Sequence, residues 1–312
     1  MIPEVPSYFI VTPPEEAVVS LDTSPTNTSA SPHPMGMPRR VVARTDGTGG
    51  AINRLVSPSG LGELMKPFVF LDHIEADGHF SPPMETGWHP HSGIATVSVV
   101  LDGAVQYAET TGSKGVLRAG SVEWMRAGGG VWHTGTALPG PVSAFQLWIA
   151  LPEHLENAPN QSRYLDPADV PEAGPVRVIL GSYQGLRSLI DSPPMTYLVV
   201  TLCDGEHWTY QPPAGHDVAW VAISRGALDT SSRITRGEVA VFEQGESQID
   251  VLADGDTQFV LGSAPKHPYP LVLGNYSVHT SGAALQQGEA EIRRIGADLR
   301  NSGMNSYALA RL

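Results

Sequence analysis

Alternating apolar and polar positions dominate the chain from residue 39 to about residue 270. Short runs rich in Val, Ile and aromatic residues are separated by clusters of Gly, Pro or Asp. Such runs predict many short β-strands, as in a sandwich or barrel. The predicted strands have the sequences VVART, KPFVFLDHI, IATVSVVL, AVQYAE, VEWMRA, AFQLWIAL, VRVILGS, TYLVVTL, VAWVAI, EVAVFE and QFVLGS.

One helix is predicted, in residues 281–303 near the end of the chain. Apolar residues recur there at spacings of seven, three and four, which places them on one face of a helix. Gly303 predicts the C-terminal end of this helix. The residues of the apolar face are Leu285, Ile292, Ile295 and Leu299.

Residues 1–38 fit neither pattern. Much of this stretch is rich in Ser, Thr and Pro and has almost no large apolar side chains. It cannot bury enough apolar surface to offset the entropy that it would lose on ordering. We therefore expect an extended or disordered N-terminal segment.

An internal repeat divides the rest of the chain. The segments VSVVLDGAV and LRAGSVEWM recur as VAISRGAL and ITRGEVAVF. In each copy a strand reaches a turn glycine, and a second turn glycine opens the next strand. These glycines are Gly103 and Gly120 in the first copy, and Gly226 and Gly237 in the second. The repeat predicts two β-domains, which we place at residues 39–160 and 161–312.

Composition and charge narrow the classes of function. Of the 312 residues, 41% are hydrophobic, which is enough for packed cores. The formal net charge of −13 argues against direct binding to nucleic acid or to an anionic membrane surface. No apolar run approaches the roughly 20 residues that span a bilayer. Because there is no secretory signal pattern and only one cysteine, Cys203, a cytoplasmic location is expected.

Three of the 11 histidines form a pattern that suits metal binding. His89 and His91 are two residues apart, so in an extended strand both side chains project to the same side. His133 follows 42 residues after His91, a distance at which a neighbouring barrel strand can bring in a third imidazole. Three imidazoles suit Fe, Ni, Cu or Zn and leave positions open for water or substrate. Taken alone, the His89–His91 spacing also fits a pair of surface or core histidines.

Longer motifs around these histidines resemble the pirin family of the cupin superfamily. The segment FLDHI is followed by HPHSGIATVSVVLDG, RAGSVEWMRAGGGVWHTG and FQLWIALP, in the family's order and spacing. The second half agrees in RVILGSYQG, in FVLGSAPKHPYP and in GNYSVHTS before the predicted helix. The resemblance covers residues 39–303, and the pair of motifs HPH and EWMRAGGGVWH is specific.

The resemblance implies an all-β fold of two antiparallel, jelly-roll-like cupin barrels in tandem with a C-terminal helix. It assigns one divalent transition metal ion to the N-terminal barrel, with iron as the first choice and Ni, Cu or Zn as alternatives. It carries the three histidine ligands onto His89, His91 and His133. The second barrel, with His216 alone, is expected to be empty.

The resemblance leaves two classes of function open. Some family members oxidise flavonols such as quercetin with O₂, which would make this chain a quercetin 2,3-dioxygenase-type enzyme with a small aromatic substrate. Others are metal-sensing partners of transcription regulators, which would make it a non-enzymatic regulatory protein with a protein partner.

Two positions depart from the family's pattern. The family's fourth ligand is typically a glutamate two residues after the third histidine, where this chain has Gly135. The first histidine motif also has a glutamate in the family where this chain has Ala95. Losing the carboxylate removes a negative charge from the metal ligands and the group best suited to take a flavonol hydroxyl proton. These departures weaken the dioxygenase interpretation.

Other residues beside the motifs are candidates for the pocket. Trp88 and Trp132 each adjoin a predicted ligand in the sequence, and Glu85 precedes the first one by four residues. Glu85, Glu109 and Glu123 could replace the missing carboxylate, but we expect all three to be solvated surface acids. No catalytic residue is assigned at this point.

Overall fold

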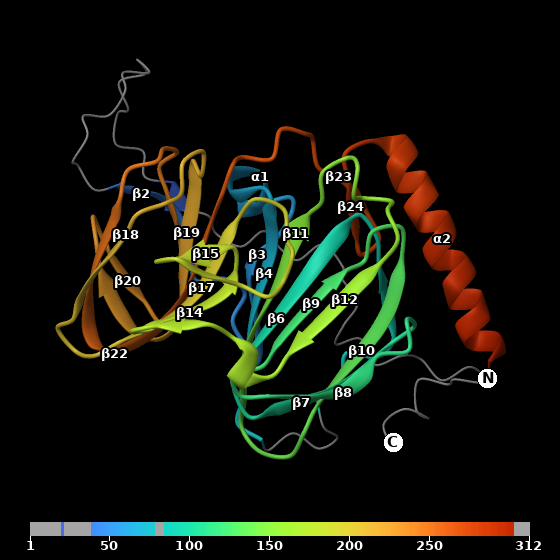
Figure 1. Cartoon of the computed structure of the whole chain (residues 1–312), viewed down its shortest axis with the longest axis horizontal. Coiled ribbons are helices and arrows are strands. Elements are labelled where there is room, and N and C mark those ends of the chain that lie inside the picture. The colour runs from blue at the N-terminus through green and yellow to red at the C-terminus, as the bar shows by residue number, and fades with distance from the viewer. Residues whose placement is uncertain (1–19, 22–38, 79–83, 303–312) are drawn as a thin grey trace.

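The computed structural model describes residues 20–21, 39–78 and 84–302, which form a β-rich body with one long helix at its C-terminal end (Figure 1). This confirms the predicted all-β class with a C-terminal helix. The expected N-terminal segment lies outside the described residues, except for β1 (Ser20–Leu21), which pairs with β2 (Val41–Thr45). Within the described ranges, no helix is long and apolar enough to cross a membrane.

The first barrel is built from two antiparallel sheets, with strand orders β12-β9-β6-β11-β4-β3 and β5-β10-β7-β8 (Figure 1). A short helix, α1 (Leu61–Met65), precedes β4. The larger sheet contains β3 (Ile52–Val56), β4 (Phe68–Ala76), β6 (Ile94–Asp102), β9 (Val122–Arg126), β11 (Val142–Ala150) and β12 (Gln161–Leu165). The smaller sheet contains β5 (His89–His91), β7 (Ala104–Glu109), β8 (Lys114–Arg118) and β10 (Val131–Ala137).

The second barrel is formed by one ten-stranded sheet in the order β1-β2-β21-β19-β22-β17-β14-β13, with β18 paired to β22 and β20 to β19. Its later strands are β13 (Glu172–Ala173), β14 (Val176–Leu180), β17 (Thr196–Leu202), β18 (His207–Tyr210), β19 (Val218–Asp229), β20 (Arg233–Thr235), β21 (Val239–Phe242) and β22 (Ile249–Ala264). Two small hairpins are β15 (Ser182–Tyr183) with β16 (Leu186–Arg187), and β23 (Val272–Gly274) with β24 (Ser277–His279).

The internal repeat is confirmed at the level of single hydrogen bonds. The amide of Gly120 donates to the carbonyl of Val100 at 2.8 Å, and the amide of Gly237 donates to that of Ile223 at 2.9 Å. All four turn glycines have positive φ values between 74° and 87°. Glycine adopts this left-handed conformation without the steric penalty of a side chain, so both copies turn in the same way.

Strand alternation separates two environments in the first barrel. On β6, Ala95 is buried in a core that the two barrels share, whereas Ser98 and Val100 face a cavity on the other side of the sheet. The shared core continues across to the second barrel, where the ring of Phe68 meets that of Trp220 edge to face, with centroids 5.5 Å apart. The barrels are therefore joined through a common apolar layer.

Three segments complicate the predicted division at residue 160. Strand β2 belongs to the second barrel's sheet, where it pairs with β21, although it precedes every strand of the first barrel. Strand β12 pairs with β9 of the first barrel although it begins at residue 161. Residues 272–301 pack on the first barrel, and the indole of Trp132 donates to the carbonyl of Ile292 at 2.7 Å. The division itself stays a prediction, because chain order and barrel membership differ at these three places.

The predicted helix is confirmed as α2 (Gly282–Asn301), while its predicted end at Gly303 lies outside the described residues. The side chain of Ser281 accepts a hydrogen bond from the amide of Ala284 and so caps its first turn. Of the predicted apolar face, Ile292 and Leu299 are buried, and Gly296 lies between them against Trp132. A side chain at Gly296 would come within 2.6 Å of the Trp132 ring, so this glycine permits the close packing of helix and barrel.

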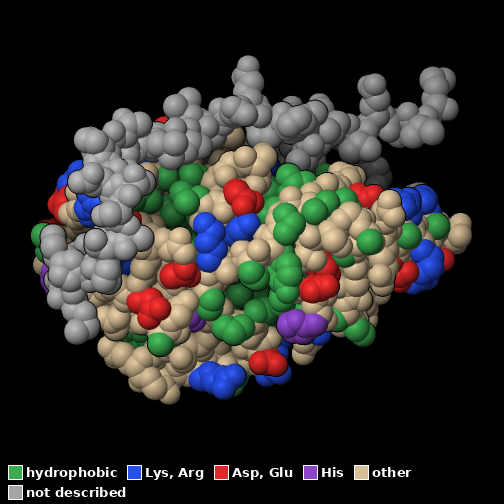
Figure 2. Space-filling view, turned by 90° about the horizontal axis from the view of Figure 1, so that it is seen from above, with side chains coloured by type: hydrophobic (Ala, Val, Ile, Leu, Met, Phe, Trp, Pro, Cys, Tyr) green, Lys and Arg blue, Asp and Glu red, His purple; other side chains and the backbone are tan. Residues whose placement is uncertain are grey.

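The surface carries both signs of charge. In the view of Figure 2, Asp and Glu side chains are interspersed with Lys and Arg over the face that the view shows, with apolar side chains between them. The expectation of no nucleic-acid partner stays a prediction.

Candidate metal centre

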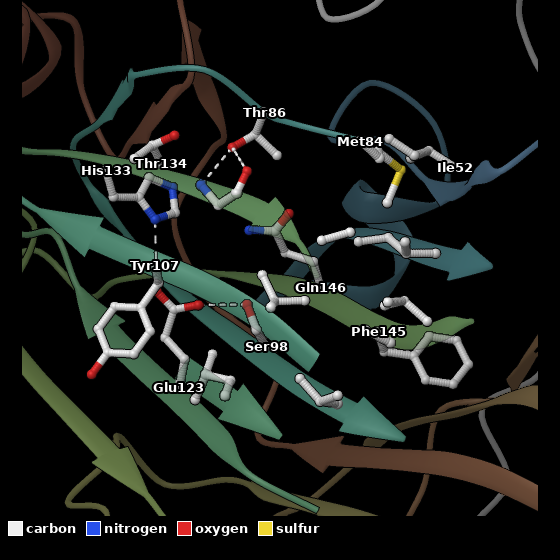
Figure 3. A pocket seen from close by; sticks show the side chains of 18 of the residues that line it. Ile52, Met84, Thr86, Ser98, Tyr107, Glu123, His133, Thr134, Phe145 and Gln146 are labelled. Carbon is white, nitrogen blue, oxygen red and sulfur yellow. Dashed lines mark hydrogen bonds and ion pairs between the residues drawn. The ribbon is translucent and has the colours of Figure 1, made fainter. Parts of the chain in front are cut away.

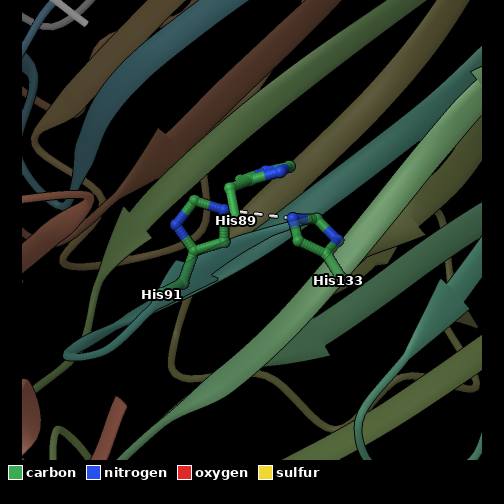
Figure 4. Close-up of side chains that lie close together, drawn as sticks. All are labelled: His89, His91 and His133. Carbon is green, nitrogen blue, oxygen red and sulfur yellow. Dashed lines mark hydrogen bonds between the residues drawn. The ribbon is translucent and has the colours of Figure 1, made fainter. Parts of the chain in front are cut away.

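Two short strands bring the three predicted histidines together. Strands β5 and β10 pair antiparallel, with His133 directly opposite His89 and Val131 opposite His91. Residues that are opposite each other, or two apart, project from the same face of a sheet. One ring nitrogen from each histidine lies within 4.8 Å of the other two (Figure 4).

Each ring has an acceptor beside Nδ1. The Nδ1 atom of His89 is 3.0 Å from the carbonyl oxygen of Gly87, and that of His91 is 3.0 Å from the carbonyl oxygen of Tyr276. The Nδ1 atom of His133 lies 3.6 Å from a carboxylate oxygen of Glu123. A carbonyl can only accept, so His89 and His91 carry their protons on Nδ1 and keep an Nε2 lone pair for a ligand.

The electrostatic environment keeps His89 and His91 neutral. Burial, followed by the charge of the neighbouring His133, lowers the pKa of His89 to about 3. Burial and the other two rings hold the pKa of His91 well below its usual value of 6.5. Neutral imidazole is the form that binds metal ions, so both rings are ready to act as ligands at physiological pH.

Two carboxylates expected at the surface are buried instead. Glu123 and Glu109 are each 5% exposed, so the prediction of solvated acids at these positions was wrong. Strand alternation on β9 places Trp124 in the shared core and Glu123 on the cavity side. The sequence offered no sign of this choice, because alternation defines two faces without saying which of them meets the cavity.

The two departures from the family pattern have different consequences. Ala95 is fully buried on the face of β6 that points into the shared core, so it lies on the far side of the sheet from the histidines. Gly135 shares a face of β10 with His133 and lines the cavity. A Cβ atom there would meet its nearest neighbours, in Val105 and Thr86, at 3.6 and 3.7 Å, so the backbone has room for a side chain.

A cavity of about 80 Å³ opens onto His89 and His133 (Figure 3). At roughly 10–15 Å³ for each water position, this space is larger than one or two bound waters need. Its walls are mostly apolar and include two aromatic rings, Tyr107 and Phe145. Polar groups on the wall include Ser98, Glu123 and Gln146 (Figure 3), and Glu123 is the one carboxylate among the described residues that line it.

The three candidate pocket residues lie elsewhere. None of Trp88, Trp132 and Glu85 is among the described residues that line the cavity. Trp132 alternates with the ligand beside it on β10, so it points outward and bonds to α2 instead. Glu85 forms an isolated β-bridge with Thr136. For Trp132, adjacency to a ligand in the sequence does not place the side chain in the cavity, because neighbours on a strand face opposite sides.

The second barrel has no comparable cluster among the described residues. The Nδ1 atom of His216 is 2.9 Å from the hydroxyl of Ser263, which also contacts the hydroxyl of Tyr210 at 2.8 Å. The barrel interior is otherwise filled by buried apolar side chains. His216 is therefore part of a structural hydrogen-bonded group.

Two barrels in tandem with a three-histidine cluster in the first define a bicupin. A family model described as pirin matches residues 51–149. A protein of Pseudomonas aeruginosa, named "Putative quercetin 2,3-dioxygenase", is 34% identical over 80% of this chain and 92% of its own length. The chain belongs to the pirin family.

Solved structures agree on the fold. A quercetin 2,3-dioxygenase from Acinetobacter baumannii superposes with a TM-score of 0.76 at 23% identity, covering 83% of this chain and 98% of that one. A bacterial pirin from Escherichia coli in complex with nickel(II) gives a TM-score of 0.57 at 18% identity, over 73% of this chain and 96% of its own. At such identities the likeness establishes the cupin fold.

Proposed function

We propose that this chain is a metal-dependent dioxygenase of the quercetin 2,3-dioxygenase type, with His89, His91 and His133 as its metal ligands. The observation that carries the proposal is the cavity that opens onto two of these histidines and has a largely apolar, partly aromatic wall. Such a wall suits a flat, mostly apolar ring system, and polar groups in it can fix the orientation of the ring.

The donor set supports the metal assignment. Three neutral imidazoles suit a divalent transition ion such as iron, nickel, copper or zinc, and they leave coordination positions open. Iron is the first metal to test. When bound, such an ion would activate a flavonol hydroxyl for reaction with O₂. The residues of this chain would orient the substrate in the cavity and exclude bulk water from it.

The absence of a glutamate at Gly135 favours a second candidate, a metal-binding regulatory protein without catalysis. In that case the metal would alter the surface around the barrel mouth for a protein partner. The two candidates share the metal site and differ only in turnover, so one assay separates them.

The first test is elemental analysis of the purified protein and of its His91→Ala variant. We expect one divalent metal ion for each chain, lost in the variant, because His91 is a fully buried member of the cluster. Equal metal content in the two proteins would contradict the ligand assignment. His216→Ala, which changes a buried histidine of the second barrel, is the matched control and should retain the metal.

The second test is incubation of the metal-loaded protein with quercetin under O₂, followed by flavonol absorbance. The dioxygenase proposal predicts a loss of absorbance that requires both the metal and O₂. Absence of turnover in a metal-loaded protein would favour the regulatory alternative.

A further inference from the structure

A buried carboxylate stands directly behind one of the three histidines. Glu123 is 5% exposed, and its Oε1 atom lies 3.6 Å from Nδ1 of His133. Its Oε2 atom accepts a hydrogen bond of 2.6 Å from the hydroxyl of Ser98 (Figure 3). A buried carboxylate without a cationic partner costs several kcal/mol in typical cases, so its presence requires a reason.

The fold itself does not supply that reason. In the repeat, Glu123 corresponds to Ala240 and Ser98 to Val221, and both residues of the second barrel are fully buried in an apolar core. The pairs are equivalent in register, because Ser98 is opposite Glu123 and Val221 is opposite Ala240. The second barrel therefore folds without a carboxylate at the equivalent position.

The hydrogen bonds of His91 and His133 show which ring nitrogen of His133 carries the proton, and so whether the Glu123 carboxylate faces an N–H group or a lone pair. The Nε2 atoms of His91 and His133 are 3.1 Å apart, so one of them donates and the other accepts. His91 carries its proton on Nδ1, facing the carbonyl of Tyr276, so its Nε2 accepts. A neutral His133 then carries its proton on Nε2. Its Nδ1 has only a lone pair, which explains why the 3.6 Å approach to Glu123 is longer than a hydrogen bond.

A metal ion bound at Nε2 requires the other tautomer of His133. The proton of the neutral ring must then be on Nδ1, where it points to Glu123. In that state the pair becomes an N–H···O⁻ hydrogen bond, with no net change in the number of protons on the ring. A carboxylate in this position fixes the orientation of a ligating histidine and raises its basicity.

We infer that Glu123 is a positioning residue of the metal site, which holds His133 in its ligating tautomer and supplies from behind the ligand the negative charge that Gly135 does not provide. The inference rests on the proposed function only in assuming that the three histidines bind a metal. It assigns to Glu123 the partial neutralisation of a divalent ion held by three uncharged ligands.

The test measures Co²⁺ affinity by competition with a chromophoric chelator, after the protein has been freed of metal by dialysis. Glu123→Gln keeps the shape of the side chain and removes its charge. We expect its dissociation constant for Co²⁺ to rise by about 10- to 100-fold. The visible absorption of bound Co²⁺ should also shift, because the donor strength of His133 changes.

Glu109→Gln is the matched control. Glu109 is also 5% exposed, lies directly opposite His133 across β7 and β10, and bonds to the hydroxyl of Ser162 at 2.8 Å. Among the described residues it makes no hydrogen bond or ion pair with a histidine, so its variant should weaken Co²⁺ binding less than Glu123→Gln does. Glu123→Asp retains the charge at the same position and should recover part of the affinity lost in Glu123→Gln, provided that circular dichroism shows all variants folded.

The outcomes separate the inference from the proposed function. If the unaltered protein binds Co²⁺ and His91→Ala does not, the site stands. In that case, equal affinities for Glu123→Gln and the unaltered protein would overturn the role of Glu123. Equal weakening by Glu109→Gln and Glu123→Gln would also overturn it, because any buried charge would then act alike. If His91→Ala binds Co²⁺ as well as the unaltered protein, the proposed metal site itself fails.

Discussion

The two barrels fill equivalent positions with opposite chemistry. In the first barrel, Gln146, Ser98 and Glu123 form one row across β11, β6 and β9, and all three line the cavity. The corresponding row of the second barrel runs across β22, β19 and β21 and is fully buried in an apolar core. It consists of Leu261, Val221 and Ala240.

This difference distinguishes side chains that stabilise the barrel from side chains that serve the binding site. An apolar row stabilises a barrel by about 25 cal/mol for each Å² of apolar surface removed from water. A polar row buries less apolar surface, so it stabilises the barrel less, and burying its carboxylate costs desolvation free energy. Because one backbone register accommodates both, the polar row of the first barrel is best explained by binding and not by folding. Three predictions test this comparison, and a fourth tests how the C-terminal segment is held on the first barrel.

The largest effect is expected from moving the carboxylate into the second barrel. Ala240→Glu places a charge in a packed apolar core without the Ser98 and His133 partners that Glu123 has. We expect a loss of about 3–5 kcal/mol in the free energy of unfolding, or failure to fold. Urea unfolding followed by tryptophan fluorescence measures it. Leu252→Glu, at a 42% exposed position of the same barrel, should change stability by only about 0.5 kcal/mol.

The next prediction concerns replacing the Ser98–Glu123 pair of the first barrel by the Val–Ala pair found in the second barrel. Ser98→Val alone leaves Oε2 of Glu123 without its hydrogen-bond donor, which should cost about 1–3 kcal/mol. The double variant Ser98→Val, Glu123→Ala removes both polar partners and should recover most of that loss. A double-mutant cycle of unfolding free energies measures the coupling. Purely additive losses would show that the two side chains do not act as a pair.

A third prediction restores the carboxylate at the family's own position. Gly135 faces the cavity, and its Cβ direction has ordinary contact distances, so a side chain can enter without displacing backbone. Gly135→Glu should tighten binding of Co²⁺ about tenfold, or about 1.4 kcal/mol, by adding an anionic ligand. Gly135→Gln has the same length without the charge and should gain less. Equal affinities in all three proteins would mean that residue 135 does not reach the metal.

Local patterns in the sequence were enough to predict the cluster but not its surroundings. The spacing of His89 and His91 fixes a common face on any strand, and the repeat fixes two similar barrels. The carbonyl that orients His91 comes from Tyr276, which is 185 residues away, and no local pattern announces such a contact. Barrel membership of β2 was likewise hidden, because its pairing with β21 is decided by tertiary packing.

The smallest expected effect is a loss of stability at lower pH where the C-terminal segment packs on the first barrel. His279 is buried, with Nδ1 3.1 Å from Oε2 of Glu156 and Nε2 3.0 Å from the hydroxyl of Ser92. Burial lowers the pKa of His279 below 6.5, although the nearby Glu156 opposes this shift. With a lowered pKa in the folded state, the stabilisation is complete above about pH 6.5. It is lost as the pH falls further, because the unfolded chain takes up the proton first.

Between pH 7.5 and pH 6 the loss from His279 should be less than about 0.8 kcal/mol. Hydrogen exchange of the amides in α2, corrected for the intrinsic effect of pH, measures it locally, with β17 and β22 of the second barrel as an internal reference. His279→Asn removes the titrating group, so the response of α2 to pH should flatten in this variant. Because Glu156 also accepts from the amide and hydroxyl of Thr280, at 2.7 and 2.6 Å, the variant keeps part of this network. An increase in the corrected protection of α2 in acid would contradict the prediction and would mean that protonated His279 pairs favourably with Glu156.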